Sequence, residues 1–216
     1  MKIVVKIGGS VAINDMGVDA EYFSRFLPVL KRLEKSNDVS LCIGGGKVVR
    51  NYFALERKLG MSDENMEKVA IEIIRAHVLF LSSLTGKSPV FSLDDVRDGN
   101  MVIGGLAPGR STDANAALLA SLIKANVFVK MTDVDGIYDK DPKKFSDATL
   151  IKKMDFDELK KFSLKGTPGN YGILDAQAIE TIAKNKIKTI IVNGKNPENL
   201  HDAIGMKIGT LITGMH

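Results

Sequence analysis

The sequence lacks tryptophan, and it has one cysteine and no apolar stretch long enough to span a bilayer. Cys42 stands inside the apolar run "VSLCIGG", so we interpret it as a small core residue. A lone buried cysteine excludes an intramolecular disulfide and fits the reducing cytoplasm. The chain begins with a predicted strand instead of the apolar segment of a signal peptide. We therefore expect a cytoplasmic protein without a membrane partner.

A strong charge of one sign is also missing. The 216 residues carry 30 Lys and Arg against 26 Asp and Glu, a formal net charge of +4. The lysines of 152–165 alternate with acids in a helical pattern that is typical of a solvated face. Because arginine clusters and interleaved aromatics are absent, nucleic acid is not an expected partner. The length and the 44% hydrophobic content allow one domain with a sizeable core.

Short β-rich runs alternate with amphipathic helical patterns along most of the chain. This alternation favours an α/β fold, with a largely parallel sheet covered by helices on both faces. The predicted strands are 2–7, 38–43, 88–91, 101–103, 126–131, 187–192 and 209–213. The predicted helices are 19–35, 46–58, 62–84, 111–124, 173–184 and 197–203. The one long irregular stretch, 132–150, is polar and rich in turn residues, so we expect a mobile clamp over a ligand.

Familiar nucleotide-binding loops are absent. The string "GGGKV" lacks the upstream glycine and the following Ser or Thr of a P-loop. The string "TGKS" at 85–88 has Leu81 where the first glycine of a P-loop belongs, and no G-x-G-x-x-G occurs. Any phosphate must therefore be held by another arrangement.

Two glycine turns, "KIGGS" at 6–10 and "IGGGKVVR" at 43–50, each follow a predicted buried strand. Glycines let a ligand approach the backbone N–H groups, which together form a concavity for anions. Lys6 adds a cation to the first turn, and Arg50 adds a forked donor one helical turn after the second. The pair of turns indicates a phosphate site, while tight turns with snorkelling lysines remain the alternative.

Two later segments carry further candidates. In "GGLAPGRSTDANAALLA", 104–120, Asp113 falls in the first turn of a helix, where it either complements the helix dipole or orients cations around a phosphoryl group. In "VFVKMTDVDGIYDKDP", 127–142, Lys130 lies within an apolar strand, which makes it a candidate for a role near the donor phosphates. Tyr138 follows the strand end, where open α/β sheets bind ligands, and suits a purine site.

In this order the four segments resemble the amino acid kinase family, and the resemblance extends from "KIGGS" to the closing "GMKIGTLI". The family implies a three-layer αβα sandwich without a P-loop. It also implies a single domain, 1–216, with an acceptor-binding part at about 1–125 and an ATP-binding part at about 126–216. The short length and the strings "PGRSTDA" and "TDVDGIYDKDP" resemble the compact archaeal uridylate kinases. This resemblance implies transfer of the γ-phosphoryl group of ATP to UMP, with Mg²⁺ held mainly by ATP, in a homohexamer built as a trimer of dimers.

The resemblance also implies roles for individual residues. Lys6 and Asp113 are the implied catalytic pair, in which Asp113 holds Lys6 in place, and the backbone N–H groups of Gly8, Gly9 and Gly45 are expected to bind phosphate. The implied ATP contacts are Lys6, Gly8, Gly9, Ser10, Gly45, Arg50, Thr132, Tyr138 and Asp141. The implied UMP contacts are Gly44, Asp63, Leu106, Ala107, Pro108, Gly109, Arg110, Ser111 and Thr112. Asp133 and Arg110 depart from the commonest family pattern.

Other functions stay open at this point. An isopentenyl phosphate kinase of the same family needs an apolar tail pocket and an early histidine, but His77, His201 and His216 all fall outside 44–60. The string "PGRSTDA" disfavours acetylglutamate, glutamate and aspartate kinases. A non-catalytic nucleotide or oxyanion storage protein is the alternative outside the enzymes, and the retention of Lys6 and Asp113 disfavours it.

Overall fold

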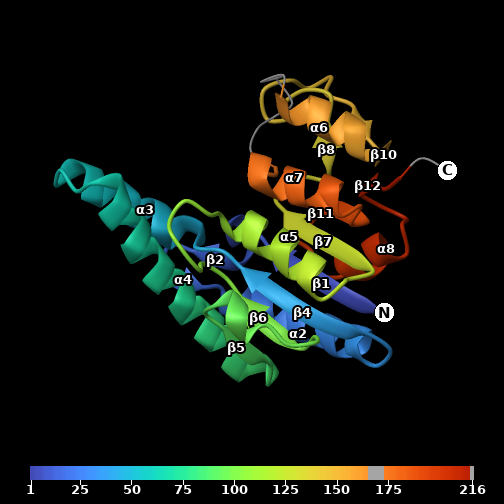
Figure 1. Cartoon of the computed structure of the whole chain (residues 1–216). Helices are drawn as coiled ribbons and strands as arrows, with labels where there is room; N and C mark the ends of the chain where they lie inside the picture. The colour runs from blue at the N-terminus through green and yellow to red at the C-terminus, as the bar shows by residue number, and fades with distance from the viewer. Residues whose placement is uncertain (165–172, 215–216) are drawn as a thin grey trace.

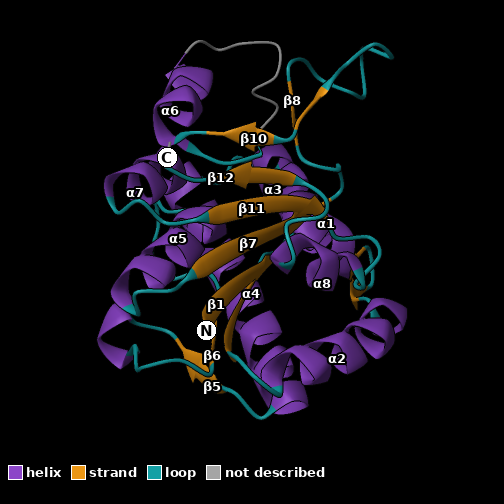
Figure 2. Ribbon diagram, turned by 90° about the vertical axis from the view of Figure 1, so that its right-hand side faces the viewer, coloured by secondary structure: helices purple, strands orange, loops and turns teal. Residues whose placement is uncertain are grey.

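One eight-stranded sheet forms the centre of the protein (Figures 1 and 2). The computed structural model describes residues 1–164 and 173–214, apart from the side chains of 162–164. In sheet order the strands are β10 (Lys153–Met154), β12 (Thr210–Ile212), β11 (Thr189–Asn193), β7 (Val127–Thr132), β1 (Lys2–Ile7), β4 (Asp38–Ile43), β6 (Met101–Ile103) and β5 (Ser88–Val90). All neighbours pair in parallel except β11 and β12. The predicted largely parallel sheet is therefore confirmed.

Helices cover both faces of this sheet, which makes three layers (Figure 2). One face packs against α2 (Ala20–Glu34), α8 (Asn199–Ile204) and the later turns of α4 (Asp63–Thr85). The other face packs against α5 (Thr112–Leu122), α6 (Phe156–Leu164) and α7 (Ala176–Lys184). The short α1 (Gly9–Ala12) and α3 (Gly46–Lys58) follow the two glycine turns. The predicted αβα sandwich is confirmed, and no helix in the described ranges is both long and apolar enough to cross a membrane.

Two small antiparallel ribbons were not predicted. One joins β2 (Ile13–Asn14) to β3 (Gly17–Val18), and the other joins β8 (Ile137–Tyr138) to β9 (Leu150–Ile151). The expectation of an irregular 132–150 was therefore wrong at Ile137–Tyr138 and Leu150, which form this second ribbon, and at Thr132, which ends β7 (Val127–Thr132). The helical pattern predicted across 152–165 was also too long, because 153–154 forms β10 and α6 begins at Phe156. Strands of two residues are too short to show a period of two, so the sequence pattern could not reveal them.

Side chains alternate between the two faces along β1. Ile3, Val5 and Ile7 belong to the core beneath α2, whereas Val4 belongs to the core beneath α5. Lys6 therefore points to the α5 face, because residues two apart on a strand share a face. The same alternation on β7 directs Lys130 to that face together with Phe128.

Candidate active site

Lys6 and Lys130 are neighbours across the sheet, because β1 and β7 pair in parallel with Lys6 opposite Lys130. Both lysines are buried, and the carboxylate of Asp113 in the first turn of α5 lies between them. The Lys6 Nζ atom is 3.1 Å from Oδ1 of Asp113, and the Lys130 Nζ atom donates a hydrogen bond to Oδ2. One carboxylate thus holds two ammonium groups, and we call these three residues the lysine–aspartate cluster.

This cluster carries one excess positive charge in a largely buried place. Burial alone would raise the pKa of Asp113, but the charges of Lys6 and Lys130 hold it below its ordinary value. Burial lowers the pKa of Lys130 to about 8, against the opposing effect of Asp113. An uncompensated buried cation costs free energy that a bound anion would offset. The cluster therefore has the electrostatics of an anion site.

The two glycine turns touch each other beside the lysine–aspartate cluster. A Cβ atom on Gly9 would lie 2.3 Å from the backbone N of Gly46, and Gly46 itself has a φ of +59°. Only glycines allow this contact. The sequence analysis explained the same glycines by the approach of a ligand and did not predict that the turns meet. One expectation was wrong, however: the N–H of Gly8 donates to the carbonyl of Met131 at 2.9 Å, so it is not available to a phosphate. The close pairing of the end of β1 with the end of β7 causes this.

The cluster and both turns open into one cavity of about 420 Å³, which we call the phosphoryl cavity. Its lining residues are Lys6, Gly8, Gly9, Ser10, Gly44, Gly45, Gly46, Arg50, Thr112, Asp113, Lys130, Thr132, Asp133, Val134, Asp141, Lys143 and Ile173. The structure thus brings together most of the predicted ATP contacts.

The sequence analysis missed Lys143. Its Nζ atom is 2.6 Å from Oδ2 of Asp133. Burial alone would raise the pKa of Asp133, but the pairing with Lys143 holds it below its ordinary value.

A second cavity of about 380 Å³ adjoins the first, since Thr112 lines both. We call it the acceptor cavity. Its lining residues are Val49, Phe53, Glu67, Ala70, Ile71, Ile74, Gly105, Ala107, Pro108, Gly109, Arg110, Ser111 and Thr112. An apolar wall from α3 and α4 thus faces the glycine-containing loop that was predicted to bind UMP.

Three predicted site residues lie elsewhere. Asp63 lines neither cavity, whereas Glu67, one helical turn later, lines the acceptor cavity and accepts a hydrogen bond from the N–H of Gly109 at 2.7 Å. The i, i+4 spacing puts both acids on the same side of α4, so the sequence pattern alone does not separate them. Leu106 lines a different cavity beside α4. Tyr138 lines neither of the two adjoining cavities, and its hydroxyl donates to Asp135 at 3.1 Å.

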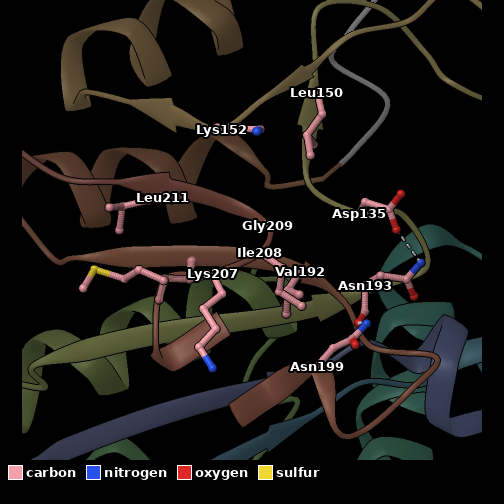
Figure 3. A pocket seen from close by; sticks show the side chains of 12 residues that line it. Asp135, Leu150, Lys152, Val192, Asn193, Asn199, Lys207, Ile208, Gly209 and Leu211 are labelled. Carbon is pink, nitrogen blue, oxygen red and sulfur yellow. Dashed lines mark hydrogen bonds between the residues drawn. The ribbon is translucent and has the colours of Figure 1, made fainter. Parts of the chain in front are cut away.

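A separate cavity of about 450 Å³ lies beside Asp135, against β11, β12 and the start of α8 (Figure 3). Leu150, Val192 and Leu211 contribute apolar walls to it, and Asn193 donates a hydrogen bond to Asp135 at 2.8 Å. The Asp135 carboxylate is thus held by Asn193 and Tyr138 together. These bonds and the β8–β9 pairing anchor the segment that was expected to act as a mobile clamp.

Comparison with known proteins identifies the family of the chain. Residues 1–84 and 86–193 match the sequence model of the Amino acid kinase family. A uridylate kinase of Methanobrevibacter smithii is 36% identical over 224 residues, which cover 98% of this chain and 99% of the relative. A uridylate kinase of Methanocaldococcus jannaschii is 33% identical, covering 99% of this chain and 100% of the relative. The chain belongs to the amino acid kinase family.

Solved structures show the same fold. The crystal structure of uridylate kinase from Archaeoglobus fulgidus matches with a TM-score of 0.81 at 32% identity, and the match covers 99% of this chain and 100% of that chain. UMP kinase from Ureaplasma parvum also gives a TM-score of 0.81, with 98% of both chains covered, but at 21% identity this likeness supports the fold alone. Both matches extend over nearly the whole of each chain, so they include the segments that form the candidate site.

Proposed function

We infer that this chain is a uridylate kinase that transfers the γ-phosphoryl group of ATP to UMP, giving UDP and ADP. The observation that carries this inference is the lysine–aspartate cluster, which lies beside two contacting glycine turns where the phosphoryl and acceptor cavities meet. Such a junction is suited to two phosphorylated ligands bound end to end. The likeness to archaeal uridylate kinases over the whole chain supports UMP as the acceptor.

The proposed mechanism is a direct in-line transfer. A phosphate oxygen of UMP is already an anion at neutral pH, so no strong general base is needed. Catalysis then requires that two anions be held together and that charge be neutralised at the transferring group. Lys6 and the N–H groups of Gly9 and Gly45 fill this role, while Lys130 adds a second cation and Asp113 orients both lysines.

Mg²⁺ is proposed to enter as a complex with ATP. The described residues contain no group of three His, Cys, Asp or Glu side chains that could hold a metal ion. Mg²⁺ keeps several waters and is commonly bound through substrate phosphates and one or two carboxylates. Asp113 is engaged by two lysines, so Asp133 and Asp141 are the carboxylates of the phosphoryl cavity that we propose for contact with Mg²⁺. Asp133 would then exchange its pairing with Lys143 for the ion.

UMP is expected to be turned over far faster than CMP, AMP or GMP with Mg-ATP. The basis is the likeness of the acceptor loop to that of the archaeal uridylate kinases. The lack of a histidine in 44–60 disfavours isopentenyl phosphate as the acceptor. A coupled assay of ADP release should compare the four nucleotides with isopentenyl phosphate and acetylglutamate. Fastest turnover of isopentenyl phosphate would instead mean the isopentenyl phosphate kinase of the same family.

A homohexamer built from dimers is also proposed. Helices α3 and α4 lie side by side (Figure 1). Large apolar side chains are exposed at two places: Tyr52, Leu55 and Leu59 on α3 and just after it, and Leu79, Phe80 and Leu84 in the later turns of α4. Exposed apolar patches of this kind mark interaction sites.

We also propose that the protein is located in the cytoplasm. The lone buried Cys42 fits that location.

Sedimentation at micromolar concentration is expected to show an assembly that Leu79→Glu reduces in mass. Leu79 is 51% exposed on α4, and Leu122 on α5 is matched in exposure at 50%, so Leu122→Glu is the control that should leave the mass unchanged. A charge placed at the centre of an apolar contact disrupts it. If the wild-type protein sedimented as a monomer, the proposed homohexamer would be wrong.

A further inference from the structure

His77 is a buried imidazole in the middle of α4, 7% exposed, and the proposed mechanism gives it no role. Its Nδ1 atom lies 3.2 Å from the carbonyl oxygen of Gly44. A carbonyl oxygen only accepts hydrogen bonds, so Nδ1 carries a proton and donates it. Burial lowers the pKa of His77, against the opposing effect of the bond to Gly44. The neutral ring therefore acts as a fixed donor that ties α4 to the second glycine turn.

This hydrogen bond fixes the direction of a peptide unit that borders the phosphoryl cavity. The chain has no cis peptide bonds among the described residues, and in a trans peptide the carbonyl and the next N–H point in opposite directions. Because the Gly44 carbonyl points to His77, the N–H of Gly45 points away from α4. Both glycines line the phosphoryl cavity, and a Cβ atom on Gly44 would be 3.7 Å from the Lys6 Nζ atom.

Without such an anchor the Gly44–Gly45 peptide could rotate at low cost, since neither residue has a Cβ atom to restrict it. A rotated peptide would present the Gly44 carbonyl oxygen to an anion in place of the Gly45 N–H. The phosphate would then meet a dipole of the wrong sign. The apolar neighbours of His77 on α4, Ile74 and Val78, show that packing alone does not require a polar side chain there.

We propose that His77 is a positioning residue, which holds the Gly44–Gly45 peptide so that the N–H of Gly45 is presented to nucleotide phosphate. The inference rests on the proposed uridylate kinase function and adds to it a residue outside the two cavities. His77 acts through the backbone and touches no reacting atom.

His77→Leu is expected to lower kcat/KM for ATP by about ten- to a hundredfold, because a preorganised donor is lost. His77→Asn should remain within about threefold of the wild type, since the Asn Nδ2 atom is a donor at a position similar to that of the His Nδ1 atom. Ser82→Ala is the matched control. Ser82 is another buried polar residue of α4 whose side chain donates to a carbonyl, that of Lys87, away from the phosphoryl cavity. Ser82→Ala should lower stability by an amount similar to His77→Leu, while kcat/KM should not change.

A second readout does not depend on turnover. In protein labelled with ¹⁵N-glycine, a non-hydrolysable ATP analogue should shift the Gly45 amide resonance in the wild type and in His77→Asn, and much less in His77→Leu. Equal activity losses in His77→Asn and His77→Leu, or an unchanged Gly45 response in His77→Leu, would overturn the positioning role. If the wild type did not phosphorylate UMP, the proposed function would fail, while the resonance test would still decide the role of His77.

Discussion

Replacement of Lys6 by alanine is expected to lower kcat by about two to three orders of magnitude, as removal of a preorganised charge stabiliser does. The Lys6 ammonium is fixed by Asp113 on one side and faces the two glycine turns on the other. A cation held in this way costs no reorganisation when charge develops on the transferring phosphoryl group. The KM for UMP should change much less, because the acceptor cavity does not include Lys6.

Lys47→Ala is the control for this experiment. Lys47 belongs to the second glycine segment, but its side chain is exposed and its Nζ atom pairs with Asp15 at 3.0 Å, outside both cavities. Steady-state kinetics of both variants, with circular dichroism to check folding, should show a large loss of kcat for Lys6→Ala alone. An unaltered kcat in Lys6→Ala would leave Lys6 a structural lysine at the end of a strand.

The sequence alone was sufficient to predict the bounds of the central strands β1 and β4. The predicted ranges 2–7 and 38–43 coincide with β1 and β4, because buried parallel strands appear as continuous apolar runs that end at glycines. The two-residue strands β8, β9 and β10 exist only through pairing with partners that are distant in the sequence or lie across a long loop. Local propensity contains no information about such pairing.

The composition of the candidate site was predicted, but its arrangement only in part. The family resemblance implied that Asp113 holds Lys6, whereas the contact of Lys130 with the same carboxylate depends on the strand order that places β7 beside β1. The same pairing occupies the N–H of Gly8, which a local interpretation of a glycine turn assigns to phosphate. The exchange of Asp63 for Glu67 is different in kind, because two acids one turn apart on a helix cannot be separated without knowing which segment faces them.

Asp113→Asn is expected to reduce both stability and activity, because it keeps the shape of the side chain and removes the one charge that contacts both lysines. Loss of one partner from a buried ion pair costs about 3–5 kcal/mol. The pKa of Asp113 is held below its ordinary value of 3.8 in the folded protein. Its stabilising contribution is therefore present above pH 3.8 and is lost as the pH falls through the depressed folded value. The variant should be destabilised at neutral pH and should approach the wild type in strong acid.

The activity of Asp113→Asn should also fall with rising pH at a lower pH than that of the wild type. Burial already lowers the pKa of Lys130 to about 8; Asp113 and Asp175 oppose this, and Lys6 adds to it. Without the Asp113 charge the Lys130 pKa falls further, so the variant loses its second cation as the pH rises through neutrality. Its kcat should be about two orders of magnitude below that of the wild type at pH 8 and should partly recover toward pH 6. Asp15→Asn is the control: it removes a carboxylate paired with the exposed Lys47 outside both cavities, and it should leave kcat and its pH dependence unchanged. Urea unfolding tests the predicted loss of stability, and kcat measured from pH 6 to 9 tests the predicted loss of activity. An Asp113→Asn enzyme with wild-type kcat throughout would show that the lysine–aspartate cluster only supports the fold.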